Sequence, residues 1–173
     1  TDMNAVIMDA KNQSYYVGVV VESAIMSMPA GIGSPLFQSV ESYLSSLLFS
    51  IPAVKGVEFG SGFELTHMMG SEANDSYHIV DNKVQTSTNH NGGITGGITN
   101  GMPVIVRCAI KPTSSIGKPQ NTVNIKDFKN TVLSVQGRHD PAIVHRIVFV
   151  INAALNYAVL DLMSSEYGLD WMR

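Results

Sequence analysis

Five glycines fall within ten residues near the middle of the chain, at Gly92, Gly93, Gly96, Gly97 and Gly101. Glycine loses more conformational freedom on folding than any other residue, so such a cluster is unfavourable wherever the backbone does not need it. Positive φ angles in tight turns, and main chain lying directly against another group, are the situations that need glycine. We therefore expect residues 89–101 to form turns, which either serve the fold alone or bring main chain close to a ligand.

A block of lysine and hydroxyl residues follows the glycine segment. It consists of Lys111, Pro112, Thr113, Ser114 and Ser115, and it offers one cation, three hydroxyls and several main-chain N–H groups. This donor set suits a phosphate or the polar edge of a cofactor. The surrounding residues are mostly basic, which favours an anionic small molecule, although a solvated basic face explains the charge equally well.

The third block places Arg138, His139 and Asp140 directly before Pro141. An aspartate followed by proline is typical of a helix start, so capping alone accounts for Asp140. An ordinary salt bridge would likewise account for Arg138. The three blocks together, rather than any single residue, indicate a cofactor pocket with proton-transfer chemistry beside it.

Size and composition exclude several classes of protein. The 173 residues fit one domain, and a net charge of −3 argues against nonspecific nucleic-acid binding. Only 14% of residues are charged, so we expect a surface buried against other copies or another domain. Cys108 is the only cysteine and the histidines lack ligand spacing, so we expect no metal. Polar residues interrupt the apolar stretch 141–163, which favours a buried helix over a membrane span.

Periodicity and turn residues predict an α+β fold in which mainly antiparallel strands pack against two long helices. The predicted elements are strands within 15–28, 54–59, 103–110 and 123–135, a hairpin turn at Asp81-Asn82, a helix from Ser34 (cap) and Pro35 to about Ser50, and a last long helix capped by Asp140.

The three blocks resemble chorismate synthase. The resemblance rests on residues 89–101, on Lys-Pro-Thr-Ser-Ser-Ile at 111–116 and on Gly-Arg-His-Asp-Pro at 137–141. Upstream, Pro-Ala-Gly-Ile-Gly-Ser-Pro at 29–35 and the segment 51–63, which contains Ala-Val-Lys-Gly, resemble two further family segments. The blocks follow the family order and spacing, so we expect the chain to be the C-terminal half of the family sequence.

The resemblance implies a fold and a reaction. The family fold is a β-α-β sandwich, with long helices between two antiparallel sheets, assembled as a cytoplasmic homotetramer. The family eliminates phosphate from 5-enolpyruvylshikimate 3-phosphate in a 1,4-anti sense to give chorismate. It needs reduced FMN, which some members obtain with NADPH. No nucleic acid or membrane takes part.

The resemblance also assigns roles to residues. The residues implied to bind the flavin are Pro52, Ala53, Gly96, Lys111, Pro112, Thr113, Ser114, Ser115 and Arg138. Asp140 is the implied catalytic residue, as a member of the proton relay at the flavin. The family segments Gly-Glu-Ser-His-Gly and Pro-Gly-His-Ala, which hold the catalytic histidines, are absent, so we expect the isolated fragment to be inactive.

Two other hypotheses remain open from the residues. The chain is alternatively a noncatalytic flavin- or phosphate-binding and oligomerisation module, which would bind FMN without releasing phosphate. A third hypothesis is a helix–sheet assembly domain in which the glycines serve only turns, and this one predicts no FMN binding.

Overall fold

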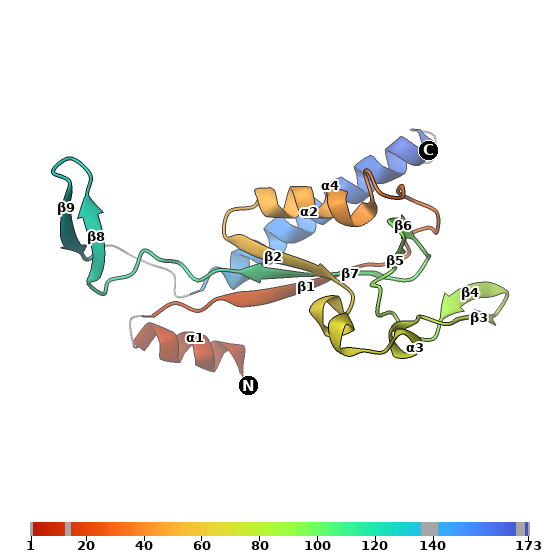
Figure 1. The fold of residues 1–173 in the computed structure, drawn as a ribbon, viewed down its shortest axis with the longest axis horizontal. Helices are drawn as coiled ribbons and strands as arrows, with labels where there is room; N and C mark the ends of the chain where they lie inside the picture. The colour runs from red at the N-terminus through yellow and green to blue at the C-terminus, as the bar shows by residue number, and fades with distance from the viewer. Residues whose placement is uncertain (1, 13–14, 136–141, 169–171, 173) are drawn as a thin grey trace.

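The centre of the molecule is a three-stranded antiparallel sheet with two helices on one face (Figure 1). The computed structural model describes residues 2–12, 15–135, 142–168 and 172. The strand order is β1 (Val19–Ile25), β7 (Val104–Ile110), β2 (Val54–Phe59), and the helices are α2 (Val40–Ser50) and α4 (Val144–Tyr167). Antiparallel strands against two long helices are the α+β class expected from the sequence, which is confirmed.

Short elements extend from this centre. They are α1 (Met3–Asn12), η1 (Gly62–His67), α3 (Gly70–Ala73) and the hairpins β3–β4 (Tyr77–Val80, Lys83–Thr86), β5–β6 (Ile94–Thr95, Ile98–Thr99) and β8–β9 (Gln120–Asn124, Lys129–Leu133). The β3–β4 turn has φ of 49° at Asp81 and 58° at Asn82, as a two-residue hairpin requires, so the predicted turn is confirmed. In Figure 1 the β8–β9 and β3–β4 hairpins lie at opposite ends of the molecule.

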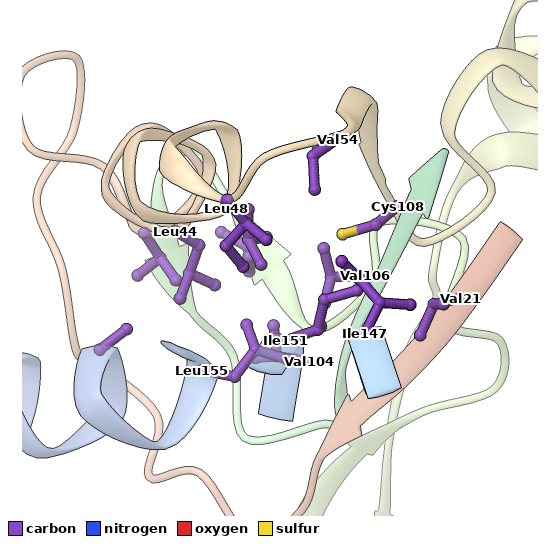
Figure 2. Packing of buried hydrophobic residues seen from close by; sticks show 14 of the residues in the cluster. Val21, Leu44, Leu48, Val54, Val104, Val106, Cys108, Ile147, Ile151 and Leu155 are labelled. Carbon is purple, nitrogen blue, oxygen red and sulfur yellow. The ribbon is translucent and has the colours of Figure 1, made fainter. Parts of the chain in front are cut away.

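The side chains of β7 alternate between the two faces of the sheet, and the core forms on one of these faces. Val104, Val106, Cys108 and Ile110 are buried, whereas the residues between them are more exposed. Burial raises the pKa of the Cys108 thiol, as expected of a small core residue. Figure 2 shows the layer that covers these side chains: Leu44 and Leu48 from α2 and Ile147, Ile151 and Leu155 from α4.

Helix α4 combines a buried stripe with an exposed apolar face. It is the one helix of the described residues that is long and apolar enough, by length and composition, to cross a membrane, with a mean hydropathy of 1.7. Its residues Ile147 and Ile151 lie in the core, as in the core helices of soluble proteins. The opposite face leaves Phe149 73% and Tyr157 59% exposed. This apolar face has no cover among the described residues.

Both predicted helix starts differ from the structure. Helix α2 begins at Val40 rather than Pro35, and its cap is Ser39, whose Oγ accepts from the Ser42 N–H at 3.1 Å. Leu36 (φ 69°) and Gln38 (φ 57°) have left-handed backbone conformations, so the helix cannot extend back through them. Helix α4 begins at Val144, and the predicted cap Asp140 lies outside the described residues.

Candidate functional site

The glycine segment forms a chain of tight turns, as predicted. All five of its clustered glycines have positive φ, between 62° and 88°. Gly92 lies directly against Gly60 in the turn after β2, where a Cβ on Gly60 would lie 2.1 Å from the His90 carbonyl oxygen. The backbone of the turn before β5 therefore packs directly against the backbone at Gly60, and no side chain fits between them.

A buried carboxylate organises the start of this segment. Asp75 is only 5% exposed, and its two oxygens accept hydrogen bonds from Thr88, His90 and Asn91. Burial alone would raise the pKa of Asp75, but hydrogen bonds from the Asn91 and His90 N–H groups and the Thr88 hydroxyl outweigh it and lower that pKa. Beside it, Ser61 Oγ lies 3.0 Å from His90 Nδ1. Sequence reasoning missed Asp75, because one acidic residue in a polar stretch gives no signal of burial.

The β5–β6 hairpin carries the glycines to the N-terminus of α2. The Gly97 carbonyl accepts from the Val40 N–H at 3.0 Å, and Thr99 hydrogen-bonds the loop before α2 through Ile32 and Pro29. Gly96, at the hairpin tip, is exposed, and a Cβ there would meet nothing within 4 Å. The tip therefore has open space in front of it.

A cavity of about 400 Å³ is lined in part by Gly33 and Ser34, which lie against Gly97 of the hairpin. Its lining also includes Tyr43, Asp161 and Glu166. The Tyr43 hydroxyl donates to Asp161 Oδ2 at 2.5 Å, and this hydrogen bond, together with burial and the negative charge of Asp161, raises the pKa of Tyr43 to about 12. Among the described residues, two carboxylates and no cation line the cavity, so these residues are unsuited to an anionic ligand.

The second group of predicted residues lies at the other end of β7. The Lys111 N–H donates to the Ala53 carbonyl at 2.9 Å, which brings the loop 111–115 against the turn that contains Pro52. Ala53 has φ of 77°, so its carbonyl is presented by a left-handed turn. Lys111, Pro112, Ser114 and Ser115 are exposed and Thr113 is half-buried, which leaves the lysine and hydroxyls available to a ligand.

A cavity of about 440 Å³ on the outer face of the sheet leads toward the same end. Lys55, Phe63 and Arg107 are among its lining residues. Arg107 Nη1 lies 2.8 Å from Glu58 Oε1, so its charge is largely neutralised within the sheet. At this end the exposed Lys55, two residues after Ala53, belongs to no ion pair among the described residues, and neither do Lys111 and Lys118. Lys118 Nζ instead lies 3.4 Å from the centre of the Tyr15 ring.

The structure thus divides the predicted flavin residues into two places. Pro52 and Ala53 lie with 111–115, whereas Gly96 lies at the opposite end of the seven-residue β7, roughly 20 Å away at the usual strand rise. Arg138 and Asp140 lie outside the described residues. Among the described residues, no group of three His, Cys, Asp or Glu side chains is arranged to hold a metal ion.

Comparison with known proteins connects this geometry to one family. The sequence pattern of the chorismate synthase family matches residues 1–164. The chorismate synthase of Korarchaeum cryptofilum is 45% identical over 167 residues, which cover 96% of this chain and 46% of that protein. That of Methanobrevibacter smithii is 44% identical over 161 residues, covering 93% of this chain and 44% of that protein.

A solved structure supports the same relationship. A crystal structure of chorismate synthase superposes with a TM-score of 0.76 at 27% sequence identity, over 95% of this chain and 42% of that one. The chain therefore spans less than half the length of these relatives. The match extends over almost all of the residues that form the sheet, the helices and the glycine turns, and from it we conclude that this chain belongs to the chorismate synthase family.

Proposed function

We propose that this chain is the C-terminal half of a chorismate synthase and forms one domain over 1–173. The whole protein would convert 5-enolpyruvylshikimate 3-phosphate to chorismate by 1,4-anti elimination of phosphate and a ring proton. The contact between Lys111 and Ala53 carries the proposal, because it joins the two segments that the family resemblance assigns to the flavin. Family membership over residues 1–164 supports it independently.

The donor set at this end fits FMN. Lys111 is exposed beside the hydroxyls of Thr113, Ser114 and Ser115, and together they match the phosphate and polar edge of such a cofactor. Reduced FMN, when bound, supplies electron density to the substrate transiently and takes up its proton. Lys111 and the hydroxyls would bind and orient it, the turn at Pro52 and Ala53 would line it, and Arg138 would contact its anionic part. Asp140 would move the proton onward from the pocket.

Gly96 needs a separate explanation, because β7 separates it from this loop by more than the length of one flavin ring system. We propose that Gly96 reaches the flavin of another copy in a homotetramer. The exposed apolar side chains of α4, Phe149 and Tyr157 among them, support burial against further protein. The remaining proposals follow the family: a cytoplasmic enzyme without nucleic-acid or membrane partners, whose flavin is reduced externally or with NADPH.

A phosphate-release assay under anaerobic conditions tests the function. The full-length protein with reduced FMN should release phosphate from 5-enolpyruvylshikimate 3-phosphate, and Asp140→Asn should lose most of that rate. The isolated 173-residue chain should release none, because the family segments that hold the catalytic histidines are absent from it. FMN binding without phosphate release by the full-length protein would instead establish the noncatalytic binding module.

A further inference from the structure

We infer that Asp75 is a positioning residue, which holds the glycine segment in the shape that meets the cofactor. The inference rests on the proposed function, in which Gly96 contacts FMN. It concerns Asp75, which lies just before β3 and to which the family resemblance assigns no role at the flavin.

Both oxygens of the Asp75 carboxylate accept hydrogen bonds from one short segment. Oδ1 accepts from Thr88 Oγ1 and from the His90 N–H, both at 2.7 Å. Oδ2 accepts from the Asn91 N–H at 2.8 Å and from Asn91 Nδ2 at 2.9 Å. Thr88, His90 and Asn91, which lie just before the first glycine turn, are thereby tied to one side chain that is only 5% exposed.

These hydrogen bonds continue into the glycine turns. Gly92, next after Asn91, donates to the Asn89 carbonyl at 3.1 Å and accepts from the Ile105 N–H at 3.2 Å. The Gly93 N–H donates to Asn89 Oδ1 at 2.8 Å, and β5 begins with the following residue. A displacement of the turn at 88–91 would therefore be passed through Gly92 and Gly93 to the hairpin that carries Gly96.

The chemistry requires a carboxylate in particular. All four partners of Asp75 are donors, and an ionised carboxylate is the side chain that offers only acceptors. An asparagine would turn an NH₂ group toward two of these donors. Asp75 forms no ion pair among the described residues, so its buried charge is held by N–H and O–H dipoles alone. A buried charge of this kind is costly for stability, which is consistent with a role in fixing one backbone shape.

The test uses the full-length protein and Asp75→Asn, with Asp81→Asn as the matched control. Asp81 lies exposed in the β3–β4 turn, and its left-handed φ of 49° is one that asparagine tolerates. At a temperature where circular dichroism shows every protein folded, Asp75→Asn should weaken FMN binding at least tenfold. It should also accelerate hydrogen exchange at the His90 and Asn91 amides at least tenfold, and Asp81→Asn should change neither.

A second variant keeps the test informative if Asp75→Asn does not fold. Thr88→Val removes one exposed donor to Oδ1 and should weaken FMN binding about twofold to fivefold. Unchanged FMN affinity in both folded variants, with or without faster exchange, would overturn the positioning role. If the wild-type protein itself binds no FMN, the proposed function fails instead, and the two failures are thus distinguishable.

Discussion

Replacing Gly60 by alanine tests the seating of the glycine segment on the sheet. The new Cβ would lie 2.1 Å from the His90 carbonyl oxygen and 2.4 Å from the Gly92 nitrogen, both backbone atoms that no rotamer change can move. Gly60 also has φ of 56°, a left-handed conformation that costs an L-residue about 1–2 kcal/mol.

The clash adds to this conformational cost. Relief of the overlap requires the segment 90–92 to move, which would break the hydrogen bonds from the Ser61 N–H to the His90 carbonyl and from the Ile105 N–H to the Gly92 carbonyl. At about 1 kcal/mol for each bond, the total loss of stability is roughly 3–4 kcal/mol. FMN affinity should fall as well, because the displaced turn leads to Gly96.

Urea denaturation of wild type and variants measures the loss directly. Gly70→Ala is the matched control, because a Cβ there meets nothing within 4 Å and Gly70 lies in α3, where alanine is favoured over glycine by about 0.5–1 kcal/mol. Gly70→Ala should therefore be neutral or slightly stabilising. If the free energy of unfolding of Gly60→Ala lies within 1 kcal/mol of the wild-type value, the close backbone contact between Gly60 and residues 90–92 is absent.

Three further changes probe the core, the electrostatics and the cofactor loop. Leu48→Ala removes a side chain with 0% exposure and should destabilise the protein by about 2–5 kcal/mol in urea, whereas Phe49→Ala, at an exposed neighbour, should cost under about 1 kcal/mol. The hydrogen bond to Asp161 raises the pKa of Tyr43 from 10.0 to about 12, so its stabilisation is complete below pH 10 and is lost as the pH rises toward 12. In Tyr43→Phe the unfolding midpoint should therefore depend less on pH across that range than in the wild type. The same pH dependence in both proteins would refute the role of this hydrogen bond. Lys111→Ala should weaken FMN binding about tenfold, as measured by fluorescence titration, and should keep a thermal midpoint within a few degrees of the wild-type value. Equal FMN affinity in both proteins would show that Lys111 does not bind the cofactor.

Local sequence signals predicted those parts of the structure that depend on neighbours along the chain. The short apolar run at 103–110 predicted β7, and Asp81-Asn82 predicted a hairpin turn. The predicted start of α2 was wrong, because Ser34 and Pro35 have the composition of a helix start. Composition does not indicate the left-handed backbone at Leu36. The β5–β6 hairpin hydrogen-bonds Ile32 and Val40, on either side of Leu36, and such contacts between distant segments are not visible in the local sequence.

The sequence by itself determined the family, the α+β class and the need for turns at the clustered glycines, since residue types and their spacing carry that information. The tertiary structure decided which distant segments meet. Only the fold buries Asp75 under the turn at 88–91, seats Gly92 on Gly60, and places Gly96 and Lys111 at opposite ends of one strand. Hydrogen bonds and steric contacts act over a few ångströms between residues far apart in sequence, so these relationships exist only once the chain has folded.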